Sequence, residues 1–172
     1  YRFSHVNDYK NLENKNGYST NVGFGETSGK FRFSFNGEYV TENYDNNDLG
    51  VNFQTNYYSL YGNVNYRTLK PTKKLNSFRI NFNVFTQYDN RTNYLQEQNF
   101  NVNLNLTTKK NHAAGMGFNV NPFERFNFYN PQVEGRYVIF PKNYGTWFWI
   151  SSNYNNKFAF DFEPNIGFAE AK

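Results

Sequence analysis

The stretch Phe100-Asn101-Val102-Asn103-Leu104-Asn105-Leu106 decides the fold, because apolar residues alternate strictly with asparagine along it. In an extended strand, successive side chains point to opposite faces, so this stretch has one apolar face and one polar face. The segment Phe78-Arg79-Ile80-Asn81-Phe82-Asn83-Val84 repeats the pattern. The rhythm returns along most of the chain without a helical period, which predicts an all-β, antiparallel sheet with two unlike faces.

The composition fits such a sheet and excludes several kinds of site. The 172 residues include 20 Phe and 15 Tyr and no Cys, so disulfide bridges and thiolate metal sites are excluded. Asparagine avoids average strands, and its regular placement here needs a wet face that can satisfy its amide. The net charge is +4, but Lys and Arg are spread along the chain, so we expect no nucleic-acid partner.

Clusters of Gly, Asn, Asp, Pro and Lys divide the chain into roughly ten strands. We expect compact turns at 26–29, 70–74, 109–112 and 141–143, and longer loops at 9–16, 43–49, 89–98 and 122–134. Tyr57-Tyr58 breaks the alternation, which indicates a bulge. The predicted strands are 1–8, 17–26, 30–43, 50–68, 77–89, 98–108, 113–121, 135–141, 145–154 and 157–163, and the tail after 163 extends the last or begins another.

Lipid or a second protein layer must cover the apolar face, and the first is favoured. No apolar run approaches the ~18 residues of a membrane helix, but barrel strands need only ~9–11 alternating residues. Charges inside the predicted strands lie on the polar face alone, and short turns alternate with longer loops. We therefore expect an up-and-down transmembrane β-barrel in a Gram-negative outer membrane. Residues 1–172 would be a single segment, an interior or C-terminal part of a longer protein that holds the remaining strands.

The alternation assigns individual residues to the two faces and to the loops. The expected lipid-facing residues are Phe31, Phe33, Phe35, Phe78, Ile80, Phe82, Val84, Phe100, Val102, Leu104, Leu106, Met116 and Phe118. The expected lumen-facing residues are Arg32, Asn36, Glu38, Asn63, Arg67, Arg79, Asn81, Asn83, Asn101, Asn103 and Asn105. The expected surface-loop residues are Asp45, Asp48, Arg91, Tyr94, Arg125 and Tyr129.

No catalytic, cofactor-binding or metal-binding set can be assembled from these residues. His5 and His112 have no carboxylate at ligand spacing, and the Asp45 to Asp48 segment lacks the Gly and Glu that complete a calcium loop. Trp147 and Trp149 could stack on sugars, but in a barrel we expect them at the lipid interface. The 122–131 loop is too aromatic for a solvated connector, so we expect it to pack into the lumen or against a partner.

The segment Tyr44-Asp45-Asn46-Asn47-Asp48-Leu49-Gly50-Val51, together with the 122–131 loop and Val133-Glu134-Gly135-Arg136, resembles outer-membrane barrels of unassigned function found in Bacteroidota. Longer members of that family look like a family-9-like carbohydrate-binding module followed by a large barrel. For a barrel of this kind we expect a non-enzymatic function, as a pore or as a membrane-embedded subunit of a transport, secretion or assembly complex. Its partners would be outer-membrane lipid, the remaining strands or other subunits, and a small solute or glycan. The alternatives are a soluble exported β-sandwich that binds polysaccharide through surface Tyr and Trp, and, last, a soluble hydrolase-like β-domain.

Overall fold

The computed structural model describes residues 2–8, 13–45, 54–131, 133 and 135–170. Their regular structure consists of strands, and they include no helix long and apolar enough to cross a membrane. The strands are β1 (Arg2–Asp8), β2 (Glu13–Glu26), β3 (Phe31–Val40), β4 (Tyr57–Arg67), β5 (Leu75–Asp89), β6 (Leu95–Thr108), β7 (Ala113–Asn121), β8 (Arg125–Asn127), β9 (Val138–Phe140), β10 (Asn143–Ser151), β11 (Asp161–Phe162) and β12 (Asn165–Ala169).

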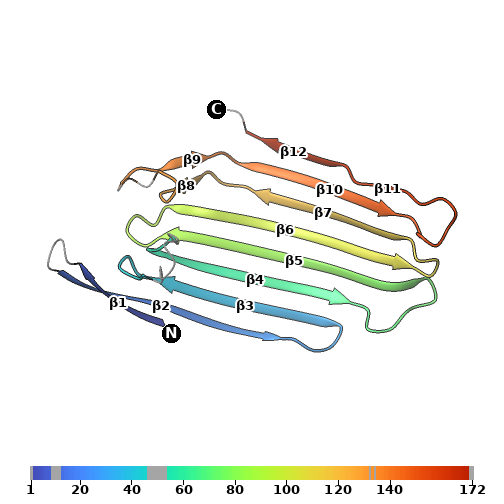
Figure 1. Ribbon diagram of the computed structural model, residues 1–172, viewed down its shortest axis with the longest axis horizontal. Helices are drawn as coiled ribbons and strands as arrows, with labels where there is room; N and C mark the ends of the chain where they lie inside the picture. The colour runs from blue at the N-terminus through green and yellow to red at the C-terminus, as the bar shows by residue number, and fades with distance from the viewer. Residues whose placement is uncertain (1, 9–12, 46–53, 132, 134, 171–172) are drawn as a thin grey trace.

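One ten-stranded antiparallel sheet holds almost all of these strands (Figure 1). Its order is β1-β2-β3-β4-β5-β6-β7-β10, with β11 and β12 both paired to β10. Consecutive strands are neighbours, as in an up-and-down meander, and the exception is the small β8–β9 hairpin inserted between β7 and β10. The prediction of an all-β antiparallel sheet is confirmed.

The described strands form an open sheet with two edges. At one edge β1 pairs only with β2, and at the other β12 pairs only with β10, within the part of the chain that the structure describes. Pro164 separates β11 from β12, so the two short strands follow one another along the same side of β10. The tail after residue 163 thus begins a strand of its own.

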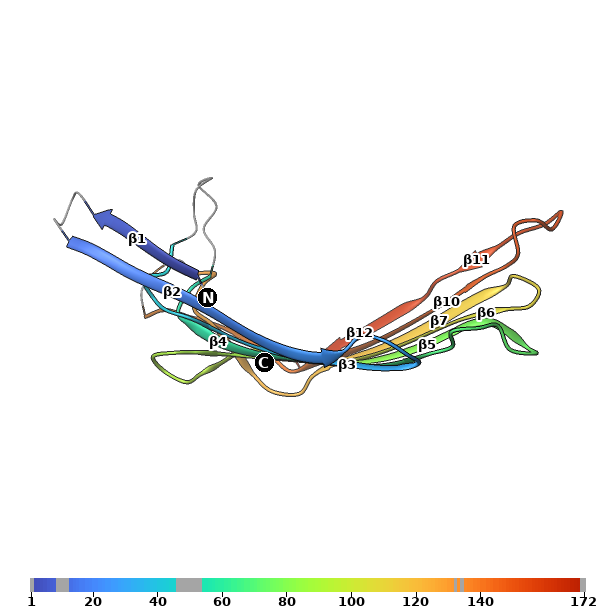
Figure 2. The same cartoon turned by 90° about the horizontal axis from the view of Figure 1, so that it is seen from below.

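The sheet is a single curved layer, as Figure 2 shows. Its burial is the reverse of a water-soluble protein, in which apolar side chains are inside. Among the described residues Val40 is the only buried hydrophobic side chain, whereas Asn65, Asn81, Gln98 and Asp89 are buried polar ones. Large apolar side chains such as Phe24, at 68% exposed, lie open. The sheet has no hydrophobic core of its own among these residues.

Several predicted segments differ from the structure. The 9–16 loop is partly strand, because β2 begins at Glu13, and only Asp161–Phe162 of the predicted strand 157–163 forms a strand. The 135–141 segment contains the expected strand, β9, but this strand lies outside the main sheet, because β9 pairs with β8 and β10 pairs directly with β7. The 141–143 segment is therefore the end of one long connection, 122–142, and not a separate compact turn. The 89–98 loop is also much shorter than expected, since β6 begins at Leu95 and only 90–94 connect it to β5.

The bulge expected at Tyr57-Tyr58 is also absent. Both tyrosines pair in regular register with β3 and β5, and the strand simply begins there, after Asn56 with a φ of 62°. Asparagine tolerates this left-handed conformation better than most residues. The register shifts lie in the β5–β6 pair instead, where Asn76 and Gln96 have no partner in the ladder. A bulge of this kind adds one residue and increases the local twist.

Candidate functional site

Strand register divides the side chains into two faces, because residues directly opposite each other in a sheet share a face. Phe82 in β5 lies between Val64 in β4 and Val102 in β6, and Met116 in β7 lies between Leu104 and Phe148. By this register the residues expected to face lipid all lie on one face, and none of them is buried: Phe31, Phe33, Phe35, Phe78, Ile80, Phe82, Val84, Phe100, Val102, Leu104, Leu106, Met116 and Phe118.

The opposite face carries rows of hydrogen-bonded asparagines. Asn63 Nδ2 donates to Asn83 Oδ1 at 2.6 Å, and Asn83 Nδ2 donates to Asn101 Oδ1 at 3.1 Å. These three residues sit opposite one another in β4, β5 and β6. A second row runs from Asn99 Nδ2 to Asn121 Oδ1 at 3.0 Å and from Asn121 Nδ2 to Asn143 Oδ1 at 2.5 Å. An amide can both donate and accept, which is why asparagine can form such rows.

The polar face is also charged differently at its two ends. The end with the β4–β5 and β6–β7 turns carries Arg32, Arg67 and Arg79, and the last two lie directly opposite each other. The end with the longer connections carries Glu38, Asp89 and Glu97 instead. The residues expected to face the lumen, from Asn36 and Glu38 to Asn81, Asn103 and Asn105, belong to this polar face by register. On strands β3 to β6 the charged residues of the polar face therefore change from basic at one end to acidic at the other.

Two tryptophans also lie on the polar face, which corrects the expectation that they sit at a lipid interface. Trp147 pairs with Gly117 and Trp149 with Gly115, so each indole covers a glycine of the neighbouring strand. A Cβ added to Gly117 would lie 2.4 Å from Trp147 Cε2, so only glycine leaves room for the ring. We call the half-buried pair Trp147 and Trp149, with the glycines beneath them, the tryptophan platform.

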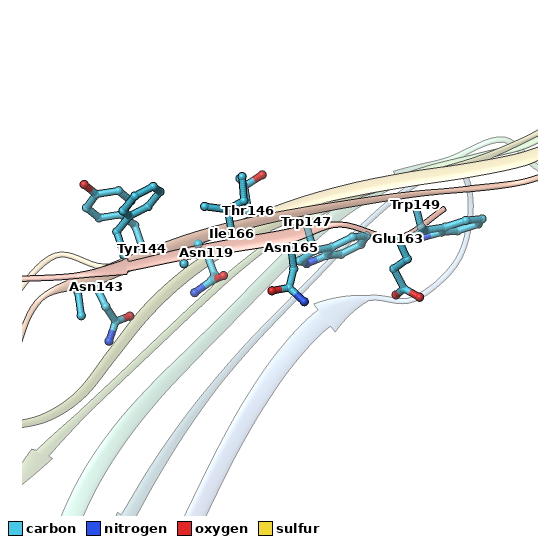
Figure 3. Close-up of a pocket in the computed structure, with 13 residues that line it drawn as sticks. Asn119, Asn143, Tyr144, Thr146, Trp147, Trp149, Glu163, Asn165 and Ile166 are labelled. Atoms are coloured by element: carbon cyan, nitrogen blue, oxygen red, sulfur yellow. The ribbon is translucent and has the colours of Figure 1, made fainter. Parts of the chain in front are cut away.

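Polar side chains surround the tryptophan platform. Figure 3 shows Asn119, Asn143, Asn165 and Glu163 on the same side of β10 as both indoles. Tyr144, Thr146 and Ile166 point to the other side. Gly145 and Gly167 form a floor of small residues beside Trp147, with nothing within 4 Å of a Cβ added to Gly167. Both tryptophans line an open hollow at this edge of the sheet, and its lining includes residues that point to each face, among them Asn119 and Tyr144.

The long connection 122–142 is folded back onto the β5–β6 turn. Tyr94 contacts Phe126 with ring centroids 4.9 Å apart, and Phe128 and Tyr137 join the same aromatic cluster. Arg125 Nη1 lies 2.9 Å from Glu97 Oε1, and the Arg125 guanidinium stacks 5.7 Å from the Phe140 ring centroid. Arg125 is buried, so the expectation that it is an open surface-loop residue is wrong.

The structure describes three of the four remaining residues that were expected in surface loops. The backbone N–H of Asp45 donates a hydrogen bond to Ser4 Oγ at 2.9 Å. Arg91 forms an ion pair with Glu42 at 3.2 Å. Tyr129 is half-buried within the 122–142 connection. Asp48 lies outside the described residues.

The β5–β6 turn has a capping network that the sequence did not reveal. Asp89, 3% exposed, accepts hydrogen bonds from the Arg91 N–H at 3.1 Å and the Thr92 N–H at 2.8 Å. The bulged Gln96 turns its amide to the same side and accepts from Gln87 Nε2 at 2.7 Å. An Asp that caps the next backbone amides is a known turn signal, and the Asp89-Asn90-Arg91-Thr92 stretch could have been recognised by it.

The described residues bring no cluster of metal-ligating side chains together. Across 2–8, 13–45, 54–131, 133 and 135–170, no group of three or more His, Asp or Glu side chains could hold a metal ion. His5 Nδ1 lies 2.6 Å from Asn16 Oδ1, and His112 Nδ1 accepts from the Asn153 N–H at 3.1 Å. The two histidines therefore have structural partners. The polar face could bind a ligand through hydrogen bonds, charged side chains and the tryptophan platform.

Comparison with known proteins identifies a family but no characterised relative. The chain matches the family described as Domain of unknown function (DUF5916) over residues 1–172, and it belongs to that family. No curated protein matches the chain. No solved structure matches it either.

Proposed function

We propose that this chain is part of a transmembrane β-barrel of a Gram-negative outer membrane. Its function would be non-enzymatic, as a pore or as the membrane-embedded subunit of a transport, secretion or assembly complex. The resemblance of the 44–51 segment and the 122–131 loop to outer-membrane barrels of Bacteroidota is one support. The observation that carries the proposal is the reversed burial, in which the apolar face lies open and the polar face is hydrogen-bonded.

A bilayer accounts for this burial. Hydrocarbon solvates Phe82 and Phe24, at 51% and 68% exposed, without a second protein layer, whereas water penalises such area by about 25 cal/mol per Å². The asparagine rows would face a water-filled lumen, where amides remain hydrated or paired. A soluble polysaccharide-binding sandwich would need a second sheet over the apolar face, and the described strands lie in one layer (Figure 2).

Closure of the barrel would come from further strands of the same protein or from another subunit. The edges β1 and β12 each have a partner on one side only among the described strands. Unpaired backbone groups cost several kcal/mol each in lipid, so an open edge is not tolerated there. The antiparallel meander order is the one that up-and-down barrels use.

Adjacent residues on the central strand β5 test the proposal directly. Phe82 and Asn83 are neighbours at nearly the same depth, but register assigns them to opposite faces. Single cysteines at the two positions, in the full-length protein in lipid vesicles, would carry a bimane fluorophore. Brominated acyl chains should quench the probe of Phe82→Cys and leave that of Asn83→Cys bright. Equal quenching of both probes, or of neither, would contradict a lipid-facing apolar face.

A further inference from the structure

The tryptophan platform is out of place on a polar face, and this is the starting point of the inference. Trp147 and Trp149 are the only tryptophans of the chain, and both lie on the polar face of one strand. Each indole has one side against a glycine, and both tryptophans line the hollow. An exposed aromatic face in water is costly unless something covers it. Residues i and i+2 of a strand lie about 7 Å apart on the same face, so the two indoles are neighbours on the polar face of β10.

Unpartnered polar groups border the platform. The side chains of Asn119, Asn165 and Glu163 take part in no hydrogen bond or ion pair within the described part of the chain, in contrast to the asparagine rows in β4 to β6. Asn119 is the next residue after Asn101 along its row, and the row stops before it. Amide and carboxylate groups of this kind can donate to and accept from hydroxyl groups. The site therefore combines a flat apolar surface with free hydrogen-bonding groups at its rim.

From this arrangement we propose that the tryptophan platform is a subsite for a neutral saccharide. A pyranose ring has an apolar C–H face that fits an indole and a rim of hydroxyl groups that both donate and accept. The rim of the hollow is mostly uncharged, since Asn119, Asn143 and Asn165 line it together with a single carboxylate, Glu163. The floor at Gly145 and Gly167 leaves room for a ring beside Trp147. The location of this subsite on a channel wall rests on the proposed function, but the binding itself does not.

Tryptophan fluorescence of the purified full-length protein tests the subsite. The probes are maltohexaose, cellohexaose, mannohexaose and xylohexaose, each titrated against the protein and against the Trp147→Phe/Trp149→Phe double variant. At least one sugar should change the emission of the unaltered protein saturably, and calorimetry should show that the double variant no longer binds that sugar. Trp147→Ala and Trp149→Ala should each weaken binding of that sugar, followed by calorimetry, by about tenfold.

A blocking variant separates ligand binding from a structural role of the indoles. Gly167→Val fills the hollow without meeting any atom within 4 Å of its Cβ, so it should abolish binding and leave the protein folded. The matched control is Phe148→Ala, on the same strand but on the apolar face, which should bind the sugar normally. Absence of a saturable change with all four sugars would overturn the proposal. Unchanged affinity in Gly167→Val would do so too, because the indoles would then only cover their glycines.

The outcomes also separate the subsite from the proposed function. Saturable binding by a protein that fails the Phe82/Asn83 quenching test would support the subsite and remove the channel. Lipid quenching as proposed, without any sugar response, would remove the subsite and leave the barrel.

Discussion

The Arg125 guanidinium meets the Glu97 carboxylate at 2.9 Å, and this ion pair joins the 122–142 connection to strand β6. The Arg125 side chain is 9% exposed and that of Glu97 is 39% exposed, so solvent screens only one partner well. Arg125 Nη2 also donates to the Pro141 carbonyl at 3.4 Å. The pair therefore holds both ends of the connection in place.

Loss of Arg125 should release the connection. We expect Arg125→Ala to cost about 1–2 kcal/mol, discounted for the exposure of Glu97, and to speed proteolysis within 122–142. Arg125→Lys should restore this only in part, because lysine cannot form two contacts from one planar group. Limited proteolysis of the membrane-inserted protein measures the effect. The control is Arg136→Ala, an exposed arginine in the same connection, and equal cleavage of both variants would refute the role of Arg125.

Arginine substitutions should separate the two faces. Arg at Phe33, Phe82 or Leu104 should cost about 2–4 kcal/mol near the bilayer centre, whereas Arg at Asn81 or Asn103 should be better tolerated. The amount of heat-modifiable, membrane-inserted protein on a gel reports the outcome. Equal losses at the apolar and polar positions would show that the apolar face does not meet lipid.

The asparagine rows should contribute to stability through their continuity. Asn83 donates to Asn101 and accepts from Asn63, so Asn83→Ala breaks two amide hydrogen bonds at once. We expect a loss of about 1–3 kcal/mol, measured as urea resistance of the extracted protein. Asn119→Ala removes an amide that has no such bonds within the described residues and should change urea resistance little. A stronger effect at Asn119 than at Asn83 would be inconsistent with the rows.

Glycine beneath Trp147 should be irreplaceable. In Gly117→Ala the new Cβ would lie 2.4 Å from Trp147 Cε2, so the indole must move into solvent. The tryptophan emission should then shift to longer wavelength. Gly167→Ala, with nothing within 4 Å of its Cβ, is the control and should leave the spectrum unchanged. An unshifted spectrum in Gly117→Ala would mean that the ring does not rest on this glycine.

Sidedness follows from the connections. In up-and-down barrels the longer connections face outside and the short turns face the periplasm. The proposed barrel would therefore expose the end with the 41–56 and 122–142 connections, and Tyr94 lies at that end although its own connection, 90–94, is shorter than the 68–74 connection of Lys73. A cysteine at Tyr94 should therefore react with a membrane-impermeant maleimide on intact cells, and one at Lys73 should not. Labelling at Lys73 alone would invert the orientation.

The alternation of apolar and polar residues correctly predicted the features that depend on a single strand, namely the strand itself and the face to which each side chain points. Phe78 to Val84 and Phe100 to Leu106 lie in the expected strands with the expected parity, because side chains of an extended strand must alternate. The Leu95-Gln96-Glu97 start of β6 was missed because the bulge at Gln96 breaks the rhythm. The Val138-Ile139-Phe140 run reads as a strand, but nothing in it reveals that its partner is β8.

Features that depend on which strands pair, or on contacts between distant segments, could not be predicted from the alternation. Around Trp147 both parities of β10 carry aromatic residues, so the alternation leaves the inner face undecided. Only register against Gly115 and Gly117 assigns the indoles to the polar face. Arg125 is similar, because a charged residue in a loop looks exposed until Glu97, 28 residues earlier in the chain, is placed beside it.

The asparagine rows give the sheet an electrical polarity across its strands. Both rows donate in the same direction, from Asn63 through Asn83 to Asn101 and from Asn99 through Asn121 to Asn143. Backbone dipoles of a sheet largely cancel, but amide dipoles aligned in this way add. Their positive ends point from β4 toward β10, so electron-rich atoms, such as the oxygens of a hydroxyl-bearing molecule, would be drawn to that side of the polar face.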